Sequence, residues 1–535
     1  MSSYNLSELI ELTTDELGDR PALITEQRAL TFTELDARAN RLAHHLRAQG
    51  VGPGDMVGLH LHNGTEYVEA MLAAFKIRAV PVNINYRYAE IELERLYDYT
   101  ELVAVVFHRG FGAAVGPVAA RLPRIRHLLV VEDGGDGEAV PGAVDYEPAL
   151  AAQPASRDFA GRSGDDLYAT CTGGTTGLPK AVLWRHEDLF FGAFNGGDIT
   201  GRSGPVGAPE EVARRAAAQP SMVQLGLAPL MHVTGHWAVL AFLAGGGTSV
   251  LAAPGPLDPR RAWDLVVEHS VNLVALVGDA MARPLIEEFA ARPVEAGSVW
   301  AIGSGGARLS PSTKLRINEL LPSVAVLDGL GSSETGVIGR NLSTSGDLGT
   351  GRFPVDASTA VLGEDLKPVA PGSGVVGMLA RRGHQPLGYF RDEVKTKATF
   401  IEVDGVRWVL SGDRASLETD GTITLHGRGS TSINTGGEKV FPEEVEKVLV
   451  DHPAVADVVV VGVPDERWGE RVTAVVQLRP GAALSVDEVR EHGRGRLAGY
   501  KLPKSLLVVP VLVRSPSGKP DYPWARAAAM EGAPT

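Results

Sequence analysis

In the first part of the chain, segments with apolar residues at helical spacing alternate with short continuous apolar runs. One group recurs at helical spacing: Leu35, Ala39, Leu42 and Leu46. Thr33 is placed to cap that helix and Gly50 to end it. Three short apolar runs, at 56–61, 79–82 and 128–131, have the length and composition of buried strands. Because strands separated by helices form βαβ units, the pattern predicts an α/β fold with mainly parallel sheets.

Near Gly427 the character of the sequence changes. The segment GRGSTSINTGG has few large apolar side chains, and a compact pattern follows it. Pro442 is suited to the first turn of a helix, strands are expected at 455–463 and 472–478, and a polar helix should start near Asp487. A last strand is expected at 506–513. We therefore predict a large N-terminal domain, residues 1–429, and a small hinged α+β domain, residues 430–535.

Length and charge restrict the class of protein. At roughly 150 residues per domain, 535 residues correspond to about three or four compact units. The net charge of −14 disfavours nucleic acid and anionic membranes as partners, although small anions need only local positive groups. No repeat of 20–50 residues is visible, so a solenoid or propeller is not expected.

Cysteine content and the N-terminus indicate a soluble cytoplasmic protein. Cys171 is the only cysteine, which excludes an intramolecular disulfide. The first 20 residues lack the basic and apolar regions of a signal peptide. The charge-free segment from Trp237 to Leu257 has membrane-spanning length, but the run Gly245-Gly246-Gly247 within it favours a core strand and turn.

The segment from Thr172 to Lys180, TGGTTGLPK, is the most informative motif. Its glycines allow close backbone approach to an anion, its three threonine hydroxyls are neutral donors, and Lys180 adds a positive charge. It follows an apolar run from Leu167, so it is expected to leave a strand. Leu178 and Pro179 separate Gly177 from Lys180, so this is not a Walker P-loop.

This loop resembles the signature of the adenylate-forming superfamily, which includes acyl-CoA synthetases, luciferases and adenylation domains. Similar motifs occur in the family's order from Leu30 to Lys519. The resemblance implies that ATP is bound by the loop residues Thr172, Gly173, Gly174, Thr175, Thr176, Gly177 and Lys180. Ala181 replaces the glycine that usually follows the lysine, and Cys171 is interpreted as a small buried hydrophobe.

Further motifs extend the resemblance to the nucleotide and the metal. The loop Gly303–Ala307 is similar to the family's adenine loop and implies that Gly305, Gly306 and Ala307 contact AMP. The segment Asp328-Gly329-Leu330-Gly331-Ser332-Ser333-Glu334 resembles an aromatic-Gly-x-Thr-Glu motif, with Leu330 in the aromatic position. It implies that Asp328, Gly329 and Leu330 line the nucleotide, that Ser333 meets phosphate and that Glu334 holds Mg²⁺.

The remaining motifs concern ribose, coenzyme A and catalysis. Asp413 in Ser-Gly-Asp resembles the ribose ligand, and Arg428 its partner. Ser430 occupies the hinge position, where Asp or Lys is usual. Three residues are implied to line the CoA tunnel: Gly436, Gly437 and Lys439. Lys519, in Ser-Pro-Ser-Gly-Lys, resembles the catalytic lysine that offsets charge at the α-phosphate.

Together these motifs predict an ATP-dependent acid–thiol ligase that forms an acyl-adenylate and then an acyl-CoA, with ATP, Mg²⁺ and CoA. Neither GxSxG nor HExxH is present to suggest a hydrolase. His232 and Gly235 resemble the motif bordering the acyl pocket, and the catalytic set is predicted to be Thr172, His232, Glu334 and Lys519.

Three sequence blocks, GRGSTSINTGGEKVFPEEVE, SPSGKPDYPWA and VGDAMARPL, resemble actinobacterial synthetases for fatty and cholesterol-side-chain acids. They favour a large apolar acid as substrate. Two alternatives stay open: an acyl-AMP ligase that delivers to a carrier-protein thiol, and a catalytically silent nucleotide-binding protein. Homo-oligomerisation is also left open.

Overall fold

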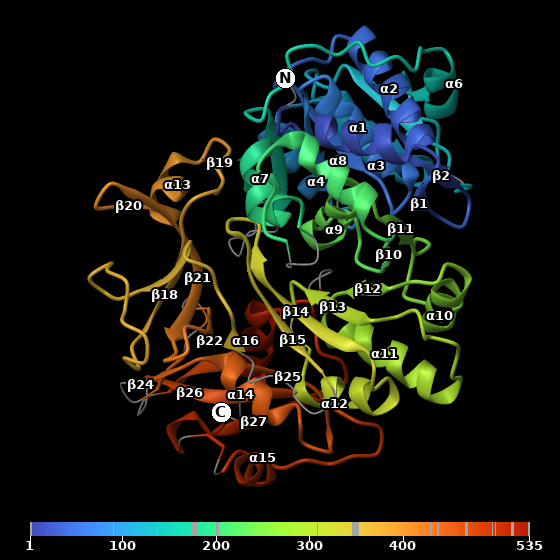
Figure 1. Ribbon diagram of the computed structural model, residues 1–535. Helices are drawn as coiled ribbons and strands as arrows, with labels where there is room; N and C mark the ends of the chain where they lie inside the picture. Colours follow the sequence, from blue (N-terminus) through green and yellow to red (C-terminus); the bar gives the residue numbers. More distant parts are fainter. Residues whose placement is uncertain are drawn as a thin grey trace.

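The computed structural model describes residues 3–88, 90–135, 137–172, 180–198, 203–307, 309–344, 352–428, 431, 433–435, 438–465, 469–494, 496–497, 499–514 and 518–532, except the side chains at 428, 434, 438, 439 and 469. Two large, mainly parallel sheets make up the upper and right-hand parts of the view in Figure 1. An antiparallel sheet lies to the left of them, and the C-terminal residues form a fourth sheet below.

The first sheet has the strand order β19-β9-β8-β4-β3-β5-β6-β7. It is parallel from β8 to β7, and β9 and β19 add antiparallel strands at one edge. Its strands are β3 (Met56–His60), β4 (Val80–Asn83), β5 (Leu102–His108), β6 (His127–Val131), β7 (Val144–Asp145), β8 (Leu167–Thr172), β9 (Lys180–Arg185) and β19 (Gly388–Tyr389).

Helices cover both faces of this sheet. One face packs against α2 and α3 and the other against α4 and α5, in two separate apolar cores. The helices of this part are α1 (Leu6–Leu17), α2 (Phe32–Ala48), α3 (Thr65–Lys76), α4 (Glu90–Tyr99), α5 (Gly112–Arg121), α6 (Tyr146–Ala151), α7 (His186–Ala193) and α8 (Pro209–Ala218), with single 3₁₀ turns at Arg109–Phe111 and Asn195–Gly197.

The second sheet has the order β15-β14-β13-β12-β10-β11-β1-β2, with antiparallel strands at its two ends. Helices α9 (Val233–Ala244), α10 (Pro259–Glu268), α11 (Gly278–Ala291) and α12 (Pro311–Leu320) connect and cover its strands. The strands are β1 (Pro21–Ile24), β2 (Ala29–Thr31), β10 (Val223–Gly226), β11 (Thr248–Leu251), β12 (Leu273–Leu276), β13 (Ala301–Gly305), β14 (Ala325–Ser332) and β15 (Gly336–Ser343).

The third sheet is antiparallel throughout and carries helix α13 (Glu393–Thr399) on its connection to β19. Its strands are β16 (Arg352–Phe353), β17 (Thr359–Leu362), β18 (Val376–Arg381), β20 (Phe400–Val403), β21 (Val406–Leu417) and β22 (Ile423–Arg428).

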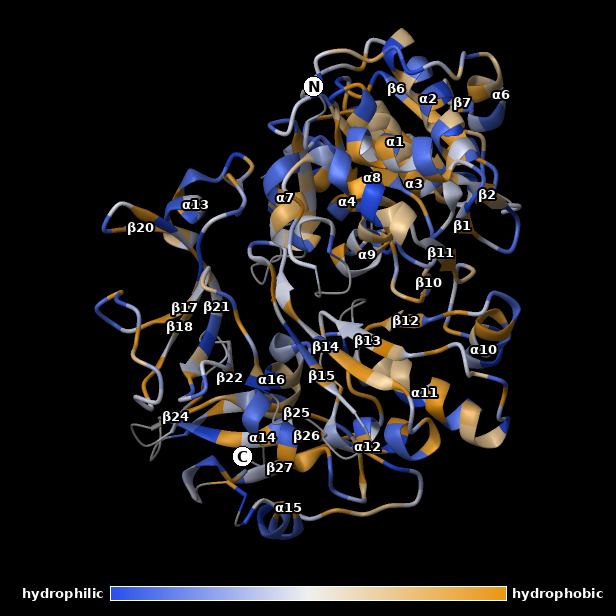
Figure 2. Cartoon of the chain, in the orientation of Figure 1, coloured by the Kyte–Doolittle hydropathy of each residue, from blue (hydrophilic) through white to orange (hydrophobic). Residues whose placement is uncertain are grey.

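The C-terminal sheet has the order β24-β23-β26-β25, with β27 added parallel to β26. Figure 2 shows α15 as almost wholly hydrophilic, as expected of a helix on the outside of a small domain. The elements are β23 (Ile433–Thr435), β24 (Glu438–Val440), α14 (Pro442–Leu449), β25 (Val455–Asp465), β26 (Gly469–Leu478), α15 (Val486–Gly493), a 3₁₀ turn (Gly499–Lys501), β27 (Ser505–Val509) and α16 (Tyr522–Glu531).

The α/β class and the mainly parallel sheets are confirmed, and three local predictions were wrong. Thr31, not Thr33, caps α2, because its hydroxyl accepts from the Glu34 amide and the Glu34 carboxylate accepts from the Thr31 amide. The last strand ends at Val509 because Pro510 has no amide hydrogen to donate to the ladder.

The third error concerns the charge-free segment from Trp237 to Leu257. The predicted turn and strand are present at 245–247 and in β11, but residues 237–244 belong to helix α9, because a helix that is apolar on every side has the same composition as a buried strand. In the described parts of the chain, no helix has the length and apolar character needed to cross a membrane.

A buried ion cluster ties the first three helices together. The Lys76 ammonium, 1% exposed, donates to Asp36 Oδ1 at 2.7 Å and also pairs with Glu11. Arg157 and Arg162 contact the same two carboxylates from a following loop. These contacts hold the pKa values of Glu11 and Asp36 below their usual range, even though burial alone would raise them.

Lys76→Met should destabilise the N-terminal part by about 3 kcal/mol, because it leaves two buried carboxylates short of a positive charge. The loss of stability is measured as the shift of the thermal unfolding midpoint, with limited proteolysis as the readout. The matched control is Lys397→Met, whose ammonium is 82% exposed in a surface pair with Glu393 and should change stability little. Equal midpoints for the two variants would contradict the importance of the cluster.

Candidate active site

The candidate site lies where strand ends of the second sheet meet the first. Strands β13 and β14 run parallel, with Ser304 beside Asp328 and Gly305 beside Gly329. Thr234, at the start of α9, lies 3.0 Å from the position that a Cβ on Gly305 would take. A side chain at position 305 would therefore block the surface against which the nucleotide is predicted to lie.

Asn83, at the end of β4, joins the two sheets beneath the predicted phosphate loop. Its amide nitrogen donates to the carbonyls of Cys171 (2.9 Å) and Met231 (2.7 Å), and its Oδ1 accepts from the Cys171 amide (2.7 Å). The first contact fixes the strand that ends at Thr172. The second fixes the turn before His232, so two predicted motifs far apart in sequence are held together.

Glu334 is held by three neighbouring groups. Its Oε1 accepts from the Tyr389 hydroxyl at 2.9 Å and its Oε2 from the Ser333 hydroxyl at 2.8 Å. The Trp184 indole donates to the Ser333 carbonyl at 2.9 Å, which fixes the backbone of the loop that carries Glu334. The carboxylate is thus oriented before any ligand arrives.

These contacts fit the predicted metal role. A carboxylate oxygen is a hard ligand, and Mg²⁺ is usually bound by one or two carboxylates together with water and phosphate oxygens. Each Glu334 oxygen carries one hydrogen bond and keeps a lone pair for an ion. Among the described residues, no group of three or more His, Cys, Asp or Glu side chains is arranged as a metal cage.

Lys180 opens β9 at the other side of the predicted phosphate loop. Burial lowers its pKa to about 8, helped by the nearby charge of Lys395. The carboxylates of Asp392 and Glu334 act in the opposite direction. Lys180 is therefore close enough to Glu334 for their charges to interact, and its phosphate role stays a prediction.

His232 caps α9 at the edge of this space. Burial, and then the charges of Lys519 and Arg87, lower its pKa to about 4, so the imidazole is neutral at pH 7. Its Nε2 is buried and has no hydrogen-bond partner among the described residues. Gly235 is required by packing, since a Cβ there would lie 2.5 Å from the Pro229 carbonyl oxygen.

Lys519 reaches this site from the C-terminal sheet. Arg514 donates to the Gly518 carbonyl at 3.0 Å and pairs with Asp457 at 2.7 Å, which holds the turn that presents the lysine. A Cβ on Gly518 would lie 3.9 Å from Val277, at the end of β12. The charge of Lys519 also lowers the pKa of His232, so the lysine lies near that imidazole, and its role in adenylation stays a prediction.

For the other predicted residues, the structure gives a single contact or a backbone conformation. Asp328 is buried, with its Oδ2 paired with Lys314 and its Oδ1 without a hydrogen-bond partner among the described residues. Asp413 and Arg428 are direct cross-strand neighbours between β21 and β22. Gly306, with φ of +79°, occupies a turn that a side chain would strain.

Several predictions lie outside the described residues. They are Gly173, Gly174, Thr175, Thr176, Gly177, Ser430, Gly436 and Gly437, and the side chains of Arg428 and Lys439. Thr172 ends β8, so the loop does leave a strand as predicted. Burial raises the pKa of Cys171 to about 12, as expected for an inert thiol.

The sequence motifs missed Asn83, Tyr389, Lys395 and Arg514. None belongs to a glycine-rich motif, and each acts through a partner more than 50 positions away. Tyr389 and Lys395 come to the site through the pairing of β19 with β9, which no local sequence pattern shows.

Comparison with known proteins agrees with this geometry. Residues 10–390 match the model of the AMP-binding enzyme family, and residues 444–519 match that of the AMP-binding enzyme C-terminal domain. A 3-oxocholest-4-en-26-oate–CoA ligase from Rhodococcus rhodochrous is 45% identical over 98% of this chain and 96% of its own. A medium/long-chain-fatty-acid–CoA/3-oxocholest-4-en-26-oate–CoA ligase from Mycolicibacterium smegmatis is 44% identical over the same shares.

Solved structures share the fold at lower identity. The anthranilate CoA ligase AuaEII in complex with anthranoyl-AMP gives a TM-score of 0.84 at 22% identity, covering 99% of this chain and 98% of that one. ATP-bound MatB from Rhodopseudomonas palustris gives 0.83 at 23% identity, covering 99% of each chain.

The fold and the two matched models define an adenylate-forming enzyme. The chain belongs to the AMP-binding enzyme family, and the predicted membership is confirmed. Within that family it is an AMP-forming acyl-CoA synthetase that uses ATP, Mg²⁺ and CoA.

Glu334→Gln should keep the fold and lower Mg²⁺-dependent adenylation about 10²-fold, because it removes the charge that holds the ion with little change of volume. Pyrophosphate release at limiting and saturating Mg²⁺ is the measurement, with circular dichroism as the fold control. Unchanged release at limiting Mg²⁺ would remove Glu334 from the metal site.

Proposed function

We propose that this enzyme acts in the cytoplasm and converts a large apolar carboxylic acid, of the fatty or steroid side-chain type, into its CoA thioester. Two full-length relatives at 44–45% identity carry such acids in their names. The observation that carries the proposal in this chain is an apolar seam behind the strand ends that form the site.

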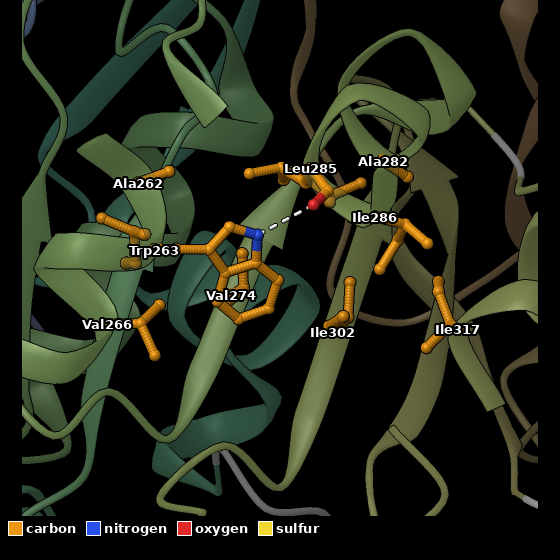
Figure 3. Close-up of a pocket in the computed structure, with 11 residues that line it drawn as sticks. Ala262, Trp263, Val266, Val274, Ala282, Leu285, Ile286, Ile302 and Ile317 are labelled. Atoms are coloured by element: carbon orange, nitrogen blue, oxygen red, sulfur yellow. Dashed lines mark hydrogen bonds between the residues drawn. The ribbon is translucent and has the colours of Figure 1, made fainter. Parts of the chain in front are cut away.

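The seam runs between α10 and α11 on one side and β12 and β13 on the other (Figure 3). Eleven apolar or aromatic residues line it, including Trp263, Ala282 and Ile302, and the Trp263 indole donates to the Leu285 carbonyl at 2.8 Å. Leu276 lines it one residue before Val277, beside which Gly518 and Lys519 approach.

The seam is nearly closed in this structure. Its volume is about 10 Å³, enough for one water at most. An acyl chain would enter by moving the side chains between α11 and the sheet, and the apolar lining would favour hydrocarbon over polar groups. Acetate would gain nothing from this surface.

The proposed first step follows from the arrangement of charges. A carboxylate oxygen of the acid attacks the α-phosphorus, forming the mixed anhydride, and pyrophosphate leaves with the electron pair of the broken P–O bond. Lys519 stabilises negative charge at the α-phosphate and Lys180 the departing polyphosphate. Glu334 is the residue that would hold Mg²⁺, which neutralises phosphate charge when bound, and Ser333 would contact phosphate.

The second step transfers the acyl group from AMP to the CoA sulfur. We propose that residues 430–535 rotate between the steps, so that the segment with Gly436, Gly437 and Lys439 replaces Lys519. One contact that holds the present arrangement is polar: Arg283 Nη1 donates to the Ala456 carbonyl at 2.9 Å. Such contacts are suited to repeated opening.

Long and polycyclic acids should give higher kcat/KM than acetate in a pyrophosphate-exchange screen followed by CoA addition. Ala282→Trp should lower kcat/KM for the best large acid about tenfold or more by filling the seam, while leaving the turnover of short acids largely intact. That retained turnover is also the fold control. Acetate as the best substrate of a broad panel would contradict the proposal.

Lys519→Ala should lower acyl-AMP formation about 10²–10³-fold and leave thioester formation from supplied acyl-AMP largely intact. Phosphorus gathers negative charge only in the first step, and a rotated domain would carry Lys519 away before the second. The two half-reactions are timed separately on the purified variant. Equal losses in both would refute the division of labour, and no loss in either would remove Lys519 from the site.

A further inference from the structure

We propose that Lys395 is a second cationic ligand of the ATP polyphosphate, which holds the pyrophosphate leaving group together with Lys180. The inference rests on the proposed phosphate role of the loop from Thr172 to Lys180. It adds a residue that lies outside every motif identified in the sequence.

Strand pairing brings Lys395 to the site. Tyr389 of β19 pairs with Val182 of β9, and the Phe390 amide donates to the Ala181 carbonyl at 2.8 Å. The chain then turns directly into α13. This register places the start of α13 beside Lys180, although more than 200 residues separate the two lysines in sequence.

The backbone around Lys395 is fixed. Its amide donates to Asp392 Oδ1 at 2.9 Å, and the neighbouring Thr396 hydroxyl accepts from the Tyr389 amide at 2.9 Å. The Lys395 ammonium lies 5.7 Å from the centre of the Tyr389 ring, within the range of a cation–π contact. The side chain is therefore held in place instead of extending into solvent.

The ammonium group of Lys395 lies close enough to that of Lys180 to lower its pKa. No described carboxylate forms an ion pair with either one. Like charges at this distance repel, and the lowered pKa of Lys180 is one sign of that repulsion. An anion with several oxygens that bridges both lysines would turn the repulsion into attraction.

The surroundings identify the anion as a polyphosphate. Tyr389, whose ring supports Lys395, also donates its hydroxyl to Glu334 at 2.9 Å. One tyrosine thus couples the lysine pair to the carboxylate that would hold Mg²⁺. Two lysines beside such a carboxylate suit the β- and γ-phosphates, whose charge grows as the bond to the α-phosphorus breaks.

The test measures pyrophosphate and ATP binding to the full-length protein by calorimetry, without any acid. Lys395→Gln should weaken both about ten- to hundredfold, the range for loss of one charge-assisted hydrogen bond. Lys395→Arg, which keeps the charge, should retain most of the affinity. Lys397→Gln is the matched control, because Lys397 lies on the same helix, is 82% exposed and pairs with Glu393.

A second measurement separates binding from folding. Thioester formation from supplied acyl-AMP and CoA should be unchanged in Lys395→Gln, while the inhibition constant of pyrophosphate in the first half-reaction rises with the same factor. Equal effects of Lys395→Gln and Lys397→Gln would overturn the proposal, as would equal loss in Lys395→Arg and Lys395→Gln.

Lys180→Gln distinguishes this inference from the function on which it rests. If Lys180→Gln weakens pyrophosphate binding and Lys395→Gln does not, the role of Lys395 is refuted and the phosphate loop stands. If neither substitution weakens binding, the phosphate role of the loop fails as well.

Discussion

The hydrogen bonds of Asn83 are the constraint on which the site depends. One buried amide holds the end of β8, where the phosphate loop begins, and the turn that precedes His232. These segments belong to different sheets, and a shared apolar core that contains Tyr168, Leu230 and Trp237 packs them together, so the Asn83 hydrogen bonds act with packing to fix their relative position. Because a buried amide left without partners is costly, the two sheets are held in one register.

Around this junction, separate elements of the fold each contribute a charged side chain. Lys180 begins β9 with Lys395 of α13 near it, and Lys519 follows Gly518, which lies beside Val277. Glu334 lies on the loop after β14. The protein carries a net charge of −14, so this concentration of positive groups is local. A polyphosphate needs only such a local field, and the surrounding acidic surface discourages larger anionic partners.

Strands β12 and β13 connect the candidate site with the apolar core behind it. Val277 and Gly305 lie at their ends, while Leu276 and Ile302 line the seam within that core. Under the proposed function, an acyl chain that opened the seam would also move these strand ends.

The sequence by itself determined the α/β class and the family, because these depend on local periods and on short motifs. The roles of the phosphate loop, Lys519 and Glu334 stay predictions. It did not distinguish helix α9 from a buried strand, since composition without an amphipathic period fits both. Only the tertiary structure brought Asn83, Tyr389 and Lys395 to the site. Their partners lie more than 50 positions away, and contacts of that kind are set by strand order and register, which no local pattern records.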